Sequence, residues 1–451
     1  MSATQTKPVA KDAEPIVALF ERLEKEGALR NPSWVFPLRQ AGLAKFAELG
    51  FPTLKDEDWR FTNVAALTKL PFKPVLQLHR HGLDAGAVEK FAFPNLGGSR
   101  LVFVDGHFAL ELSTLKPESG VKLTNLATAL NSDFGLLEKH LGRYSNGERN
   151  PFTALNTAFF HDGALIHIAA NASPSPIHLL FISTSRETGL ASHPRNLVIA
   201  ERGAQAVIVE SYVSLDGKPT VTNTVTEAVI GENAHVEHIK FQDESAETFH
   251  LGSLHAEISR SANYLYHSIA AGARLSRTNL HTVFDGEGIE CVLNGLYLVN
   301  GDRVADHFMV VDHAKPRCNS HEYFNGILDG KSKGVFAGRI LVRPDAQKTD
   351  AKQTNKNLLL SDTATADTKP QLEIYADDVK CTHGATIGQL NDDSIFYLRA
   401  RGIGLDKARR MLIHAFAGEI MDRIKCEPAR KHLDETVWER LEQHAAVAVS
   451  K

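Results

Sequence analysis

Cysteine is scarce in this sequence, and its few positions do not suit a disulfide framework. The 451 residues include four cysteines, and none of them form a CxxC pair: Cys291, Cys318, Cys381 and Cys426. Secreted domains that depend on disulfides have a denser and more regular set. We therefore expect a protein of a reducing compartment and predict that it is cytoplasmic.

Long apolar runs and an excess of charge of one sign are also missing. The sequence has no apolar run of the roughly 18 residues that a membrane span needs, so we predict no membrane partner. The N-terminal stretch lacks the apolar segment of a signal peptide, and its acidic residues disfavour a transit peptide. Lys and Arg number 50 against 54 Asp and Glu, a net charge of −4, so nucleic acid is not an expected partner either.

Two familiar active-site motifs are absent or incomplete. The segment GILDGKSKG (326–334) ends like a phosphate-binding loop, but Gly326 and Gly330 enclose three residues where that loop has four. It is also followed by a strand-like sequence rather than by a helix, so we predict no ATP site in this chain. HExxH does not occur, and HEYFN (321–325) lacks the second histidine of that zinc motif.

The first part of the chain has the periodicity of helices. Apolar residues recur at helical spacing in 16–23, and AGLAKFAELG (41–50) predicts a second helix that ends at Gly50. The aromatic segments PSWVF and DEDWRFTNV lie between and after these helices. We expect their aromatic side chains to dock the helices on the body of the protein.

From about residue 155 to about residue 390 the sequence changes to short, alternating segments typical of strands. Examples are 164–170, 205–213, 222–230 and 235–241, which are separated by Gly, Asn or Asp. So many short strands suit an antiparallel sandwich or a solenoid. The recurrence of segments that end in histidine, such as NAHVEH and SANYLYH, favours a parallel β-helix, in which similar residues stack in ladders. On this pattern His238 and His267 would occupy the same position in successive coils, as wall residues rather than metal ligands.

After Asp393 the helical period returns. Leu405, Ala408, Leu412, Phe416 and Ile420 fall three or four residues apart, and several arginines surround them. Such a helical pair could cap the open end of a solenoid. It could equally provide a docking surface for a partner.

The strongest local signal for chemistry is KCTHGATIG (380–388). On an extended strand Cys381 and His383 point to the same face, about 7 Å apart, and Thr382 points to the other. Two soft or borderline ligands do not complete a zinc or iron–sulfur site, which usually takes four. From the residues alone, the pair is inert, is half of a metal site completed by another chain, or is a nucleophile with its base.

The segment GRILVRPDAQKTDAKQTNKNLLLSDTATADTKPQLEIYADDVKCTHGATIGQL (338–390), together with the following YLRARGI, resembles the C-terminal core of the SufB/SufD family of iron–sulfur cluster assembly proteins. DEDWRFTNV near the start and FNGILDGKSKGVFAGRI at 324–340 fit the same family order. KCTHGAT and DEDWRFT are more similar to the SufD branch than to the SufB branch. The resemblance extends over most of the chain.

The resemblance implies a mainly β fold, a right-handed parallel β-helix flanked by N-terminal and C-terminal α-helical regions. We therefore predict an N-terminal helical region with some strand at 1–150, a β-helix core at 151–392 and a C-terminal helical region at 393–451. The family further implies a complex in which a SufB-like chain pairs with this one and a SufC ATPase docks on the helical C-terminus. A homodimer of the isolated chain is a further expectation.

By position, His383 matches the family histidine implied in cluster assembly at the SufB interface, and Cys381 is its neighbour. The implied cofactors are a transient iron–sulfur cluster shared with SufB and, in the complex, reduced FAD. Cys291, Cys318 and Cys426 match no motif and are expected to be structural. The residues predicted to dock the ATPase are Arg399, Arg401, Arg409, Leu412, Phe416 and Ile420.

We accordingly predict a non-enzymatic scaffold subunit at whose interface a nascent cluster is built. Three alternatives stay open at this point. One is a purely architectural subunit that does not contact the cluster, and another is the SufB-type scaffold itself. The third is a β-helix hydrolase or lyase, which should show clustered acidic or arginine side chains on one face.

Overall fold

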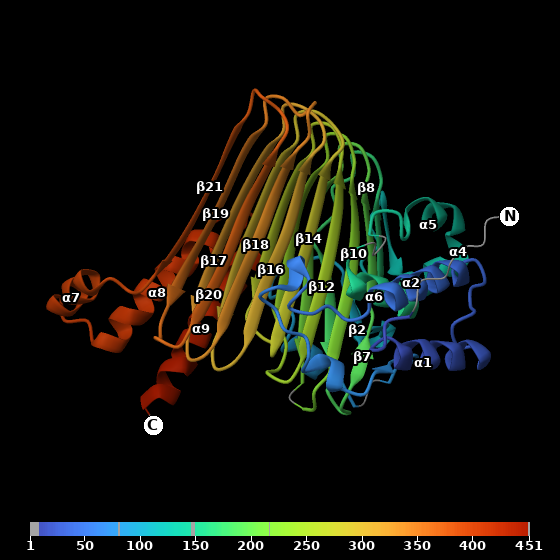
Figure 1. Cartoon of the computed structure of the whole chain (residues 1–451), viewed down its shortest axis with the longest axis horizontal. Helices are drawn as coiled ribbons and strands as arrows, with labels where there is room; N and C mark the ends of the chain where they lie inside the picture. The colour runs from blue at the N-terminus through green and yellow to red at the C-terminus, as the bar shows by residue number, and fades with distance from the viewer. Residues whose placement is uncertain (1–8, 80–81, 146–148, 216, 450–451) are drawn as a thin grey trace.

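The structure is a computed structural model that describes residues 9–79, 82–145, 149–215 and 217–449. At its centre the chain winds through two parallel sheets, and from β8 onward successive strands enter them alternately (Figure 1). Each coil thus adds one strand to each sheet. This confirms the predicted mainly β fold, a parallel β-helix between helical ends, and excludes the antiparallel sandwich.

The first sheet, called sheet A here, has the strand order β20-β18-β16-β14-β12-β10-β8-β5-β4. Its only antiparallel pair is β4 with β5 among the strands that the structure describes. The bounds of its strands, with β1, which pairs with β7, are β1 (Lys73–Pro74), β4 (Val121–Asn125), β5 (Ala164–Ile168), β7 (Leu190–Ser192), β8 (Arg195–Ala200), β10 (Val221–Ile230), β12 (Phe249–Ile258), β14 (Leu275–Phe284), β16 (Val304–His313), β18 (Lys333–Val342) and β20 (Thr365–Ile374).

The second sheet, sheet B, has the order β21-β19-β17-β15-β13-β11-β9-β6-β2-β3. The strands predicted at 164–170, 205–213, 222–230 and 235–241 are confirmed as β5, β9, β10 and β11. The bounds in sheet B are β2 (Arg100–Val104), β3 (His107–Phe108), β6 (Ile177–Ser183), β9 (Gln205–Ser214), β11 (His235–Asp243), β13 (Asn263–Ala270), β15 (Glu290–Val299), β17 (Asn319–Leu328), β19 (Asp350–Leu359) and β21 (Lys380–Gly388).

One residue in the left-handed conformation precedes each sheet B strand from β9 to β19 by two positions. A positive φ is easiest for glycine and for short polar side chains, which is why Gly and Asn separate the strands in this sequence. These corner residues are Gly203, Asn233, Ser261, Gly288, Arg317 and Lys348, with φ between 55° and 70°. The repeated corner returns the chain to sheet B once per coil.

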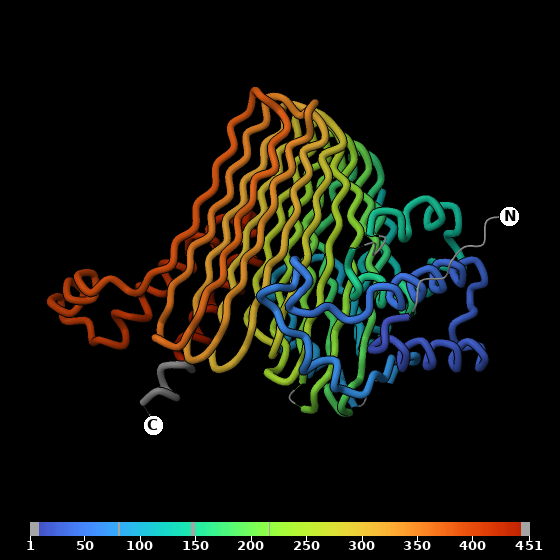
Figure 2. The backbone as a smooth tube through the Cα atoms, in the orientation of Figure 1, coloured from blue at the N-terminus to red at the C-terminus, as the bar shows by residue number. Residues whose placement is uncertain are grey.

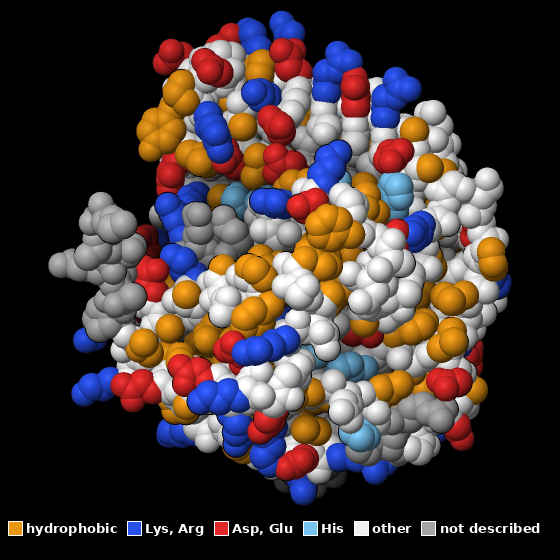
Figure 3. Space-filling model, turned by 90° about the vertical axis from the view of Figure 1, so that its right-hand side faces the viewer, with side chains coloured by type: hydrophobic (Ala, Val, Ile, Leu, Met, Phe, Trp, Pro, Cys, Tyr) orange, Lys and Arg blue, Asp and Glu red, His pale blue; other side chains and the backbone are white. Residues whose placement is uncertain are grey.

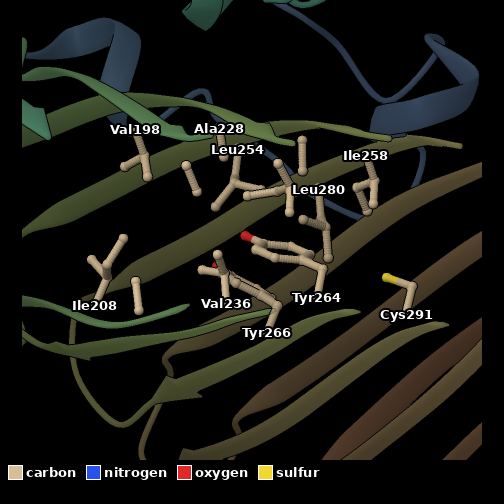
Figure 4. Close-up of a cluster of buried hydrophobic side chains, with 14 of the residues drawn as sticks. Val198, Ile208, Ala228, Val236, Leu254, Ile258, Tyr264, Tyr266, Leu280 and Cys291 are labelled. Carbon is tan, nitrogen blue, oxygen red and sulfur yellow. The ribbon is translucent and has the colours of Figure 1, made fainter. Parts of the chain in front are cut away.

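The space between the two sheets, here called the lumen, is filled by side chains from both of them (Figure 4). Val198, Ala228 and Leu254 enter it from sheet A, and Tyr264 and Tyr266 enter it from sheet B, all at most 5% exposed. Because side chains alternate along a strand, each strand gives one row of residues to the lumen and one to the outer face. The lumen is therefore a packed core.

The register corrects one prediction about the histidines. His238 pairs with Tyr266, whereas His267 pairs with Ile239. His238 therefore faces the lumen, where it contacts the Glu210 carboxylate at 3.0 Å, and His267 faces outward. The predicted stacking of the two histidines is wrong, because a shift of one residue moves a side chain to the other face.

The N-terminal region covers the first coils, and strands from it extend both sheets. The predicted helices at 16–23 and 41–50 are confirmed as α1 and α2. The helices of this region are α1 (Glu14–Lys25), α2 (Phe36–Leu49), α3 (Ala85–Glu89), α4 (Leu126–Ser132), α5 (Phe134–His140) and α6 (Pro151–Phe159). Trp59, from the predicted docking segment, is 4% exposed and lies under the Arg277 guanidinium, 3.8 Å away. On the face at this end of the molecule, acidic and basic side chains are interspersed (Figure 3).

The C-terminal region consists of α7 (Asp392–Ala400), α8 (Leu405–Met421) and α9 (Glu427–Val449). Buried apolar residues of α8 and α9, among them Ile413 and Leu433, pack on the outer face of sheet B against Ile239 and Leu296. The helices therefore lie beside the β-helix, and α7 projects away from it (Figure 2). The interpretation of this region as an end cap is wrong. No helix in the described ranges is long and apolar enough to cross a membrane.

Candidate functional site

The last coil of the β-helix is its most exposed part. Among the described strands, β20 pairs only with β18, and β21 pairs only with β19. No residue of β20 or β21 is buried, whereas most residues of the earlier coils are. The lumen is therefore open at this end, and two strand edges are left with unpaired backbone groups.

Cys381 and His383 lie on β21 at this open end. Cys381 pairs with Ala351 of β19, and His383 pairs with Gln353. Ala351 and Gln353 are 1% exposed and belong to the lumen row, so both residues of interest face the lumen side of the last coil. The structure thus brings Cys381 and His383 to one face of one strand, as the spacing predicted.

The two side chains differ in exposure and reactivity. Cys381 is half-buried and packs against a buried apolar cluster that includes Ile340 and Val342, whereas His383 is exposed. Burial raises the pKa of the Cys381 thiol, and the nearby Asp350 carboxylate adds to the shift. A thiol with a raised pKa is a poor nucleophile at neutral pH, which disfavours the covalent-enzyme interpretation of the pair.

Behind His383 the lumen holds a polar ladder of two buried side chains. His383, Gln353 and Glu322 are register partners on β21, β19 and β17. The Gln353 side-chain amide donates a hydrogen bond to the Glu322 carboxyl group. Burial raises the pKa of Glu322 to about 8, so this carboxyl group is mostly protonated at neutral pH.

A second lumen ladder continues from Cys381 through Ala351 and Ser320 to Cys291. Cys291 is 1% exposed, and burial raises the pKa of its thiol well above the ordinary value. Cys318 is also buried, in the same apolar core, while Cys426 is half-buried. All four cysteines are free.

The described residues hold no cluster of three or more His, Cys, Asp or Glu side chains that is suited to a metal ion. At the open end, Cys381 and His383 offer one sulfur and one imidazole. Zinc and iron–sulfur sites usually have four protein ligands. The pair can therefore bind a metal ion or cluster firmly only when other ligands come from outside the chain.

The residues predicted to dock an ATPase divide into two groups. Arg399, Arg401 and Arg409 are exposed. Leu412 and Phe416 are half-buried, and Ile420 is 1% exposed in the contact between α8 and sheet B. ATPase contact stays a prediction, and in this chain Ile420 serves the packing of α8.

Sequence reasoning missed Gln353 and Glu322. Glu322 lies in HEYFN, which resembles only part of a zinc motif, and Gln353 lies in a polar strand without any motif. Glu322 and Gln353 lie one coil apart, in the same row of side chains as His383. The sequence spacing of these residues matches the length of one coil. This spacing shows that they are neighbours only once the register of each strand is known.

The fold and the open coil define a class of protein, a parallel β-helix with a cysteine and a histidine on the lumen side of its exposed end. Residues 181–416 match the SufBD core domain of the SUF system for FeS cluster assembly. Residues 11–177 match the SufBD protein N-terminal region. The chain belongs to the SufBD family of iron–sulfur cluster assembly proteins.

Curated relatives extend over nearly the whole chain. The chain is 32% identical to the iron–sulfur cluster assembly protein SufD of Escherichia coli, over 93% of this chain and 95% of that protein. It is 37% identical to an iron–sulfur cluster assembly SufBD family protein of Synechocystis, over 86% of each chain. It is 28% identical to the chloroplastic protein ABCI7 of Arabidopsis thaliana, over 94% of this chain and 90% of that protein.

Proposed function

We propose that this chain is a SufD-type scaffold subunit that pairs with a SufB-like chain through the open end of its β-helix. A nascent iron–sulfur cluster is then built between Cys381 and His383 and ligands of the partner. A SufC ATPase docks on the C-terminal helices, and the chain itself catalyses no reaction. The observation that carries this proposal is that both candidate ligands lie on the lumen side of β21, in the uncovered last coil of the part of the chain that the structure describes.

The surface of the last coil supports pairing with another protein. Ile374 and Ile387 are lumen residues that are 40% and 50% exposed, because no further coil of the described chain covers them, and Tyr375 beside them is 63% exposed. Large apolar side chains next to unpaired strand edges are an unfavourable free surface in water. A second β-helix would bury these apolar side chains and would form hydrogen bonds with the strand edges. In a homodimer, a second copy of this chain would do the same.

The ligand chemistry supports transient rather than permanent cluster binding. A neutral imidazole is a competent iron ligand but a weaker one than a thiolate, and the Cys381 thiol must lose its proton before it binds a metal ion. A cluster that is held partly by these groups and partly by a partner's thiolates can leave when the interface opens. This suits an assembly site that has to release its product.

The C-terminal helices support the docking of a second partner. Phe396 and Tyr397 on α7 are 74% and 56% exposed, and Leu405 at the start of α8 is 42% exposed. The Arg401 guanidinium lies 4.5 Å from the Tyr397 ring centroid. Exposed aromatic side chains with arginine are typical of protein interfaces. We assign nucleotide hydrolysis to this partner. Residues 326–334 run from the end of strand β17 through a short turn into strand β18, whereas a phosphate loop leads into a helix.

The test is to co-express this chain with its SufB-like and SufC-like neighbours and to isolate the complex through a tag on this chain. Wild type and His383→Ala are compared for recovered partners and for iron and sulfide content. Recovery of both partners with at least a tenfold lower cluster content is the expected result. Equal cluster content would refute the cluster role and would favour the purely architectural subunit.

The SufB-type alternative has a separate test. A SufB-type scaffold should hold a coloured cluster on the isolated chain after reconstitution with iron and sulfide. The two ligands at the open end predict that the isolated chain stays colourless. A stable cluster on the isolated wild-type chain would therefore favour the SufB-type assignment.

A further inference from the structure

The side chain of Gln353 is buried but only half satisfied. It is 1% exposed, and its amide nitrogen donates to the Glu322 carboxyl group. Its amide oxygen, Oε1, is buried and has no hydrogen-bond partner, and neither has the second carboxyl oxygen of Glu322. A buried polar atom without a partner costs about 1–3 kcal/mol, so its presence calls for a physical reason.

The surroundings hold this amide in one place. On the far side of the lumen, Gly338 of β18 leaves the space that the amide occupies. A Cβ atom at position 338 would lie 2.7 Å from Cδ of Gln353, well inside contact distance. Glu322 fixes the nitrogen end of the amide, and Gly338 leaves room for its body, so the side chain is positioned rather than loosely packed.

The neighbour of Gln353 on the open side is His383. The two residues are register partners on β19 and β21, and adjacent strands lie about 4.8 Å apart. Within the part of the chain that the structure describes, no hydrogen bond from the His383 side chain is found. A buried acceptor without a hydrogen-bond partner therefore lies one strand away from an imidazole that makes no hydrogen bond.

We propose that Gln353 is a positioning residue for His383, whose ring N–H donates to the free amide oxygen when a partner covers the last coil. This proposal rests on the proposed function, in which the other ring nitrogen of His383 meets the nascent cluster. A ligating histidine almost always donates its second ring N–H to a carbonyl or carboxylate oxygen, which fixes both the tautomer and the orientation of the ring. Glu322 on β17 in turn fixes Gln353 on β19, so two successive coils contribute to the orientation of His383.

Two near-isosteric substitutions separate this role from a role in packing. Gln353→Met removes the acceptor oxygen and keeps an unbranched side chain of similar length. Gln353→Glu keeps an acceptor oxygen but places a second carboxyl group beside Glu322 in the dry lumen. On packing and electrostatics alone, the Glu variant should have the lower thermal midpoint, because two buried carboxyl groups repel or must share a proton.

The proposal predicts the opposite order for the cluster content of the two variants. In the isolated complex, Gln353→Met should keep its partners and lose at least about tenfold in cluster content, the loss typical for the support of a metal ligand. Gln353→Glu should stay within about threefold of wild type despite its lower midpoint. A Met variant within twofold of wild type would overturn the proposal, and so would a cluster content that follows the order of thermal midpoints.

The same strand offers a matched control. Asn357 is also in the lumen row of β19, is 4% exposed, accepts a hydrogen bond from Tyr297 at 2.6 Å and pairs with Ile387 rather than with His383. Asn357→Leu should lower the thermal midpoint and leave the cluster content within twofold of wild type. An equal loss in Asn357→Leu and Gln353→Met would overturn the proposal.

The design also separates this proposal from the proposed function. If His383→Ala keeps its cluster, the proposed function fails, and the positioning role fails with it. If His383→Ala loses its cluster but Gln353→Met does not, the positioning role alone is refuted.

Discussion

The buried carboxyl group of Glu322 should make this protein less stable at high pH. Burial raises its pKa from 4.5 to about 8 in the folded state. Between these two values the unfolded chain loses the proton while the folded chain keeps it. The free energy of unfolding therefore falls as the pH rises from 4.5 to 8, because the folded state binds more protons than the unfolded state.

The size of this effect follows from the shift. Each pKa unit corresponds to about 1.36 kcal/mol, so the full shift amounts to a loss of at most about 5 kcal/mol between pH 4.5 and pH 8. Entry of water or rotation of the carboxylate toward the open end relieves part of it, so we expect a loss of at least about 2 kcal/mol. Glu322→Gln removes the titration and can keep the hydrogen bond to Gln353.

The assay is urea unfolding of wild type and Glu322→Gln at pH 5, 7 and 9. The difference in free energy of unfolding between variant and wild type should increase in favour of the variant from pH 5 to pH 9. Glu247→Gln is the matched control, because Glu247 is exposed on a loop. Its replacement should change the free energy of unfolding by the same amount at all three pH values. A constant difference between Glu322→Gln and wild type would refute the reasoning.

Two further predictions concern packing and docking. Gly295→Ala should cost about 1–3 kcal/mol in the free energy of unfolding, because the new Cβ atom would overlap Cδ1 and Cε1 of Phe324. Gly384→Ala, where nothing lies within 4 Å, should change it by less than about 0.5 kcal/mol, and equal effects in urea unfolding would contradict the packing argument. Phe396→Ser on α7 should reduce recovery of the SufC-like ATPase in the pull-down by at least about tenfold, while the 74% exposure of Phe396 leaves the thermal midpoint unchanged. Full recovery of the ATPase would place its docking site elsewhere.

The sequence predicts the features that depend on local periodicity. The β-helix follows from short alternating segments and regular turn residues, and the corner residues Gly203 and Asn233 show why those residues recur. The shared face of Cys381 and His383 follows from the two-residue period of a strand. Each of these features needs only the residues on one strand or in one turn.

Features that depend on the pairing of distant strands could not be predicted from periodicity. His238 and His267 end similar segments, yet the register places them on opposite faces, because His267 lies one residue further from its corner, Ser261, than His238 lies from Asn233. The same uncertainty concealed Gln353 and Glu322, which become neighbours only through the pairing of β17 with β19. Periodicity alone also cannot show which surface an amphipathic helix covers, so α8 could be read as a cap although it packs on the outer face of sheet B.

The two ends of the β-helix differ in a way that supports the proposed pairing with another chain. At the N-terminal end, sheet A finishes with the antiparallel β4 and sheet B with the antiparallel β3, and helices of the same region pack nearby. At the C-terminal end, α8 and α9 pack on the outer face of sheet B, so the last coil stays open. The apolar residues at this opening, Ile374 and Ile387, contribute their full burial free energy to stability only when a partner covers them. The same contact would surround His383 with protein on both sides, and in that closed state the buried amide of Gln353 obtains its missing donor. Partner binding and ligand orientation would therefore occur in one step, and opening the interface would reverse both.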